Sequence, residues 1–88
     1  MESGIRVEIP LKAPSILFDR YKTIGELKEP YPNLSFVKYI YLDPIDNKLK
    51  GANPPNELPL VENAYLTIVG TFGDVIKFVK DATSLSDF

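Results

Sequence analysis

The 88-residue chain contains no cysteine, no histidine, no tryptophan and no glutamine. Without cysteine there are no disulfide bonds and no thiolate zinc sites, and without histidine the Ser/His and Cys/His nucleophile pairs are excluded. Histidine is also the side chain whose unperturbed pKa lies closest to neutrality, so acid–base catalysis would need a carboxylate, lysine or tyrosine with a strongly shifted pKa. The missing residue types argue against an enzyme, and we expect no metal ion and no cofactor.

An excess of charge of one sign is lacking as well. Ten lysines and arginines against twelve aspartates and glutamates leave a net charge of -2, without the positive excess that polyanion-binding proteins carry. No apolar run approaches the roughly 20 residues of a membrane span, and the first residues lack the pattern of a signal peptide. We therefore expect a cytoplasmic protein. Little Cys, Gln and Met beside abundant Pro, Ile and Lys is typical of heat-adapted proteins.

The length allows one domain, which we place at residues 1–88. With 44% hydrophobic and 25% charged residues the composition matches an average soluble domain. The regular patterns run from residue 5 to residue 82, and this range is the predicted structured core. We expect the tail, 83–88, to fray.

Three segments carry the pattern of β-strands: residues 5–12, 34–42 and 64–69. The second is rich in aromatic and β-branched residues, and residues 48–50 are a candidate for a short return strand. A helix is predicted over 75–82, preceded by the capping residues 71–74. The strict alternation of the second strand places Phe36, Lys38, Ile40 and Leu42 on one face and Val37, Tyr39 and Tyr41 on the other. The predicted buried face of the helix consists of Phe72, Val75, Ile76, Val79 and Ala82.

Residues 16–28 fit two alternatives. In the first they form a helix capped by Ser15. In the second, residues 16–22 are a strand that pairs with the first strand as a hairpin, and a short helix begins at Thr23, where Thr23 to Glu26 has the spacing of a capping box. We place the hairpin slightly ahead, because Gly25 costs least in the first turn of a helix.

These elements predict an α+β fold, a small mixed or antiparallel sheet with the C-terminal helix packed on one face. With the hairpin, the helix at residues 23–27 and the strand at 65–69 complete a layout that resembles the β-grasp (ubiquitin-like) fold over residues 5–70. The chain ends Ser-Leu-Ser-Asp-Phe without the Gly-Gly of the modifier and carrier members, so the resemblance does not imply carrier chemistry. With the helix instead, the order matches most of a ferredoxin-like split unit.

Two short motifs have both a functional and a structural interpretation. Gly70 to Gly73 lies between a strand and a helix, where phosphates bind free N–H groups, but Asp74 would repel an anion. We interpret the motif as a strand end and an N-cap. Asp43, Asp46 and Asn47 lack the further oxygen ligands and the glycine of a calcium loop, so we interpret them as a turn.

An aromatic strand face is the basis of one functional hypothesis. Tyr39 and Tyr41 could stack on bases, with Lys38 as the neighbouring cation, although we interpret these aromatic residues first as packing within the sheet. Six cations between residues 20 and 50 are almost cancelled by five anions, so the electrostatic signature of a nucleic-acid surface is absent. Nucleic-acid binding is therefore the alternative function, and a small-ligand binder or a carboxylate-, Lys- or Tyr-based enzyme is the third.

The preferred hypothesis is a non-enzymatic protein–protein interaction module, a small accessory subunit or adaptor that docks on a larger protein. Proline-bearing loops lose little entropy on binding, which suits the loop at 51–59 for contact with a partner. Phe78 with Leu85 and Phe88 could add an exposed apolar strip; the alternative is that Phe78 completes the core and the tail is disordered. The free sheet edge is a third place for docking. The candidate contact residues are Pro54, Pro55, Pro59, Phe78, Leu85 and Phe88.

Overall fold

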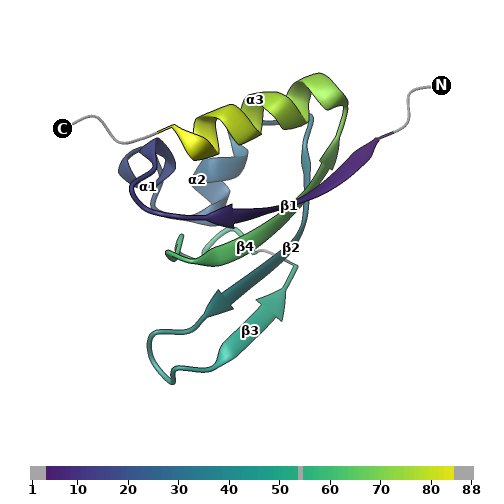
Figure 1. Cartoon of the computed structure of the whole chain (residues 1–88). Coiled ribbons are helices and arrows are strands. Elements are labelled where there is room, and N and C mark those ends of the chain that lie inside the picture. The colour runs from purple at the N-terminus through teal and green to yellow at the C-terminus, as the bar shows by residue number, and fades with distance from the viewer. Residues whose placement is uncertain (1–3, 54, 85–88) are drawn as a thin grey trace.

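A computed structural model describes residues 4–53 and 55–84 and shows a four-stranded sheet with helices over one of its faces (Figure 1). The predicted α+β class is confirmed. The second strand begins and ends within one residue of its predicted bounds, whereas the C-terminal helix begins at residue 72 and not at residue 75. In chain order the elements are β1 (Ile5–Leu11), α1 (Ile16–Arg20), α2 (Ile24–Lys28), β2 (Ser35–Leu42), β3 (Leu49–Ala52), β4 (Ala64–Gly70) and α3 (Phe72–Thr83).

The strands lie in the order β1-β4-β2-β3, and every neighbouring pair is antiparallel. Because β4 is antiparallel to both β1 and β2, these two strands run parallel to each other with β4 between them. That is the split β-α-β arrangement of the alternative layout, to which β3 adds a strand at the outer edge. The predicted hairpin is wrong, because residues 16–20 are helical and β1 pairs with β4. The β-grasp layout is not confirmed.

Local capping explains why residues 16–28 form two helices. The Ser15 side chain accepts a hydrogen bond from the N–H of Leu17 and begins α1. The Thr23 side chain accepts one from the N–H of Glu26 and begins α2, while the Glu26 carboxylate accepts the N–H of Lys22 at 2.7 Å. The predicted capping box is therefore present in a variant form, in which the Glu26 carboxylate accepts the N–H of the residue before the cap and not that of Thr23 itself.

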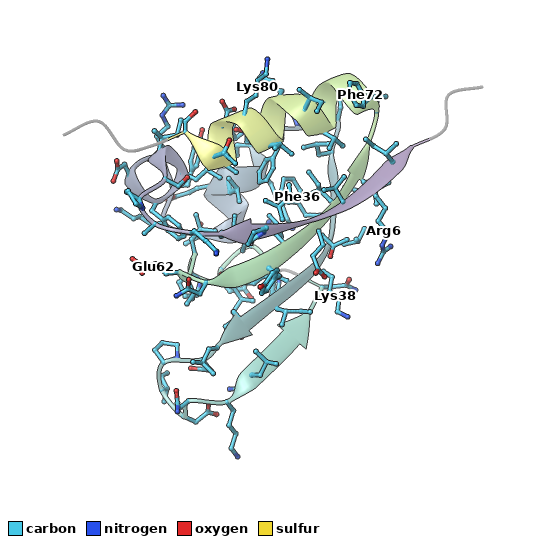
Figure 2. The ribbon with its side chains drawn as sticks, in the orientation of Figure 1. Arg6, Phe36, Lys38, Glu62, Phe72 and Lys80 are labelled. Carbon is cyan, nitrogen blue, oxygen red and sulfur yellow. The ribbon has the colours of Figure 1, made fainter. Side chains whose placement is uncertain are left out.

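Strand β2 contains an irregularity that reverses the direction of one side chain. The register with β4 shifts between Phe36 and Lys38, so Phe36 pairs with Ile68 and Tyr39 pairs with Leu66. Ile68 and Leu66 are two residues apart and share a face, so Phe36 lies on the face of Tyr39 and not on that of Lys38 as predicted. Figure 2 shows Phe36 directed toward α3 and Lys38 directed away from the helices.

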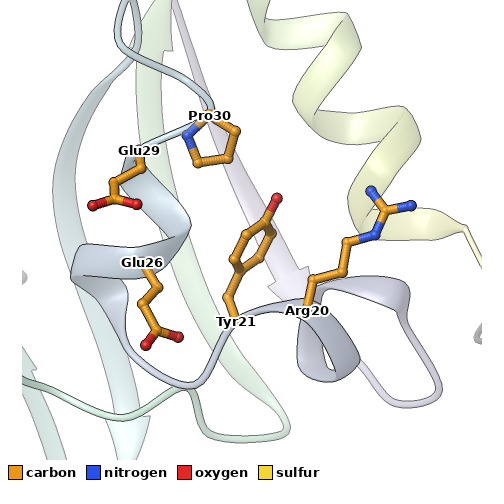
Figure 3. Close-up of a pocket in the computed structure, with 5 residues that line it drawn as sticks. All are labelled: Arg20, Tyr21, Glu26, Glu29 and Pro30. Atoms are coloured by element: carbon orange, nitrogen blue, oxygen red, sulfur yellow. The ribbon is translucent and has the colours of Figure 1, made fainter.

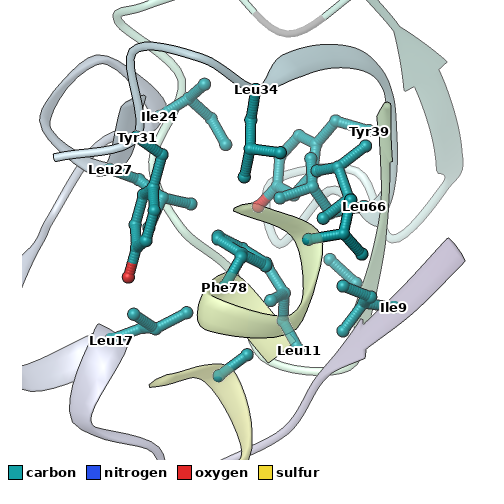
Figure 4. Close-up of a cluster of buried hydrophobic side chains, with 14 residues drawn as sticks. Ile9, Leu11, Leu17, Ile24, Leu27, Tyr31, Leu34, Tyr39, Leu66 and Phe78 are labelled. Carbon is teal, nitrogen blue, oxygen red and sulfur yellow. The ribbon is translucent and has the colours of Figure 1, made fainter. Parts of the chain in front are cut away.

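The core fills the space between the sheet and the three helices (Figure 4). Phe78 is at its centre and makes edge-to-face contacts with Tyr31 at 5.0 Å and with Phe36 at 5.8 Å between ring centroids. In α3 the buried side chains are Val75, Phe78 and Ala82, whereas Phe72 is 68% exposed. Within the described residues, none of the helices is long and apolar enough to cross a membrane.

Candidate interaction surface

The proline-bearing loop is held against the start of α2 by its backbone. The N–H of Ile24 donates to the carbonyl of Leu58, and the N–H of Gly25 donates to the carbonyl of Asn56, each at 2.9 Å. Pro55 and Pro59 are exposed on this segment, and Pro54 lies outside the described residues. The loop therefore stabilises the start of α2. Its prolines remain candidate contact residues.

The predicted apolar strip at the C-terminal end does not include Phe78. That side chain has no exposed surface, so its assignment to an exposed strip is wrong. The helix continues to Thr83, and the carbonyl of Ser84 accepts a hydrogen bond from the N–H of Ile16. Leu85 and Phe88, the other members of the predicted strip, lie outside the described residues.

The predicted nucleic-acid face does not form one surface. Tyr39 has no exposed surface, and its hydroxyl donates to the carbonyl of Pro59 at 3.0 Å and accepts the N–H of Val61 at 2.9 Å. Burial raises the pKa of Tyr39, and the hydrogen bond from Val61 opposes that rise. Tyr41 is half-buried and stacks on Tyr39 with ring centroids 5.0 Å apart, whereas Lys38 projects from the opposite face. The assignment of Tyr39 as a base-stacking residue is therefore wrong.

The acidic residues between β2 and β3 form a turn, as predicted. The carboxylate of Asp43 accepts the N–H of Ile45, and that of Asp46 accepts the N–H of Lys48. Lys50 returns from β3 and binds both carboxylates, at 2.6 and 3.1 Å. The hydrogen bond from Lys50 lowers the pKa of Asp43. Among the described residues no cluster of three or more metal-ligating side chains occurs.

The motif before α3 also serves as a cap. The Thr71 side chain accepts the N–H of Asp74 and donates to its carboxylate at 2.9 Å. The aspartate therefore occupies the N-terminus of α3 that a phosphate would need. The interpretation of this motif as an N-cap is confirmed.

A depression with a volume of about 490 Å³ lies between α1 and α2 (Figure 3). A shallow site with one cation beside two carboxylates does not select one kind of ligand, and the Glu26 carboxylate is already bound to the backbone of Lys22. The depression therefore gives no support to a particular ligand. Its lining consists of Arg20, Tyr21, Glu26, Glu29 and Pro30.

Exposed apolar side chains gather at the hairpin formed by β2 and β3. Leu42 pairs directly with Leu49, and both project from the sheet face that the helices leave uncovered. Leu42 is 48% exposed and Leu49 is 73% exposed, while Ile45 in the connecting turn is 94% exposed. We call these three residues the hairpin patch. Figure 1 shows the hairpin extending from the sheet on the side away from α3.

Sequence reasoning placed Leu42 on a strand face and Leu49 in a possible return strand, but it did not name either as a contact residue. The pairing of β2 with β3 and the restriction of the helices to one face are both needed to show that the patch is uncovered. The signal in the sequence was that Ile40 and Leu42 lie on one face of a strand whose other face is also apolar, so one of the two faces could be uncovered.

No protein family model, curated protein or solved structure matches this chain. The fold and the surface therefore define it only as a small α+β domain with one uncovered sheet face, and its function is argued from the surface itself.

Proposed function

We propose that this chain is a non-enzymatic protein–protein interaction module, a small accessory subunit or adaptor of a larger complex, and that the hairpin patch is its contact surface. The observation that carries the proposal is the exposure of Leu42, Ile45 and Leu49 at one projecting hairpin. Fully burying a side chain of this size contributes about 1.5–3 kcal/mol of favourable free energy, so a partner that covers the patch would gain binding free energy from each of the three side chains.

The surroundings of the patch indicate the chemistry of the partner. Lys50 is bound to Asp43 and Asp46, whereas no ion pair of Lys48 occurs among the described residues. The patch thus combines an apolar centre with a polar rim that carries one unpaired cation, which is the usual anatomy of a protein contact. A partner with an apolar depression and an acidic group at its margin fits this surface.

The proposal is tested by placing a photo-crosslinking amino acid at position 49 and, as a control, at position 72. Phe72 is the matched control because it is 68% exposed and lies on α3, in the helical layer. We expect position 49, and not position 72, to crosslink to a larger protein in the cells that make this chain. That protein is then identified by mass spectrometry and purified.

Binding to the purified partner decides the outcome. Leu49→Asp should weaken binding at least about tenfold, because an unpaired carboxylate would have to be desolvated in the contact, whereas Phe72→Asp should leave the affinity unchanged. Circular dichroism confirms that both variants are folded. Equal crosslinking from the two positions, or equal affinity of the two variants, would refute the hairpin patch as the contact surface.

A further inference from the structure

The uncovered face of the sheet carries three exposed charges, Arg6 and Glu8 on β1 and Lys38 on β2, and of these Glu8 and Lys38 have opposite signs at matching positions. Glu8 on β1 and Lys38 on β2 both pair with Thr67 on β4, so the three side chains form one row across the three strands. The next row consists of Pro10, Tyr65 and Ile40, which is apolar and follows the same register. The central strand therefore has an acidic group on one side and a basic group at the same height on the other.

Neither charge is neutralised within the chain. Glu8 and Lys38 are exposed, and the ion pairs found among residues 4–53 and 55–84 involve neither of them. In the apolar row beside them Tyr65 is 45% exposed, whereas Thr67, between the two charges, is buried. Such a surface suits a partner that places a basic group opposite Glu8, an acidic group opposite Lys38 and apolar side chains opposite the apolar row.

We propose that a second copy of this chain packs face to face on this surface, with a twofold axis that runs along β4. Such an axis exchanges the positions of β1 and β2. Glu8 of each copy then lies over Lys38 of the other copy, which gives two equivalent ion pairs, and Tyr65 of one copy lies over Tyr65 of the other. The face is self-complementary because its own acidic and basic groups flank the axis.

Packing through the edges of the sheet is opposed by the residues found there. The outer strand β1 contains Pro10, which has no N–H to donate to a neighbouring strand. At the other edge, β3 has four residues and is flanked by Lys48 and contains Lys50, and short, lysine-bearing edge strands oppose pairing. Of the surfaces of the sheet, the uncovered face is therefore the one available to a second copy.

The area of the face limits the affinity that the dimer can reach. Three strands about 4.8 Å apart and seven residues long, at about 3.3 Å per residue, cover a footprint of roughly 330 Å² on each copy. Specific stable interfaces bury about 800 Å² per partner, so the dimer should be weak and reversible, with a dissociation constant in the micromolar range or above. Each β3 would extend beyond β1 of the other copy, which leaves Leu49 and the turn with Ile45 uncovered, whereas Leu42 on β2 lies beside the end of β1 of the other copy.

Two charge reversals test the arrangement. In Glu8→Lys the facing groups of a dimer are all positive, and in Lys38→Glu they are all negative, so each variant alone should self-associate roughly tenfold more weakly than the native chain. An equimolar mixture of the two variants restores both ion pairs between unlike copies and should regain the native association. The pair Glu29→Lys and Lys77→Glu is the control, because it changes the net charge equally at two exposed positions in the helical layer, the C-cap of α2 and the surface of α3.

Sedimentation velocity over about 10 µM to 1 mM measures the association, since this range brackets the expected strength. The expected results are a reversible dimer for the native chain and for each control variant, and recovery only in the mixture of the two face variants. A native chain that stays monomeric over the whole range would overturn the inference. So would a mixture that associates no better than its components. Neither result bears on the hairpin patch, which is tested with a different partner.

Discussion

The hydroxyl of Tyr39 ties the centre of the sheet to the loop that covers α2, and its removal is the sharpest test of this fold. The hydroxyl donates to the carbonyl of Pro59 and accepts the N–H of Val61, so Tyr39→Phe removes two hydrogen bonds at one atom. Each bond contributes about 1 kcal/mol net. We therefore expect the free energy of unfolding to fall by about 2 kcal/mol, a large part of the 5–15 kcal/mol of a typical domain.

Tyr41→Phe is the matched control. Tyr41 stacks on Tyr39 and has no hydrogen bond of its hydroxyl among the described residues, so its free energy of unfolding should change by less than about 0.5 kcal/mol. Urea denaturation followed by circular dichroism measures both variants, and the midpoint of thermal unfolding should fall by about 10 °C for Tyr39→Phe alone. Equal stability of the two variants would refute the structural role of the Tyr39 hydroxyl.

Two further predictions concern stability. Burial raises the pKa of Tyr31 and of Tyr39, and the hydrogen bond to Asp81 at 2.5 Å raises the pKa of Tyr31 further. Both side chains therefore ionise at a higher pH in the folded chain than in the unfolded chain, where a tyrosine ionises near pH 10. Urea denaturation should show stability falling as the pH rises above about 10, and falling less steeply in Tyr31→Phe. A flat profile between pH 9 and 11 would contradict this. Gly25→Ala should destabilise the fold by about 1–3 kcal/mol because its Cβ would lie 2.9 Å from that of Asn56. Gly73→Ala, whose Cβ meets nothing within 4 Å, should stabilise α3 by up to about 1 kcal/mol, and equal effects of the two substitutions would refute the close packing at Gly25.

The sequence predicted the elements whose signals are local. Strand β1 alternates strictly, and the caps at Thr23 and Thr71 depend on residues three positions apart, so these features followed from the amino acids alone. The order of the strands did not follow, because the insertion of β4 between β1 and β2 depends on pairing between segments more than fifty residues apart. The preferred hairpin was wrong for the same reason.

Two aromatic residues show why the candidate site was only partly predictable. The bulge before Lys38 moves Phe36 to the covered face, and nothing in a run of apolar residues distinguishes a bulged strand from a regular one. In α3 the helical period allows a buried face through Phe72 or through Phe78, and packing against Tyr31 and Phe36 selects Phe78. The sequence therefore left open whether Phe78 belongs to an exposed strip or to the core, and the structure places it at the centre of the core.

The side chains that hold the fold together and those that we propose for contact lie on opposite faces of one sheet. Tyr39 and Leu66 face the helices and are completely buried, whereas Leu42 and Leu49 face away from them and remain exposed. Because the exposed leucines contribute little to the core, their substitution should leave the free energy of unfolding nearly unchanged. A loss of binding in such variants therefore reports on contact and not on folding, which is the separation that the binding experiments depend on.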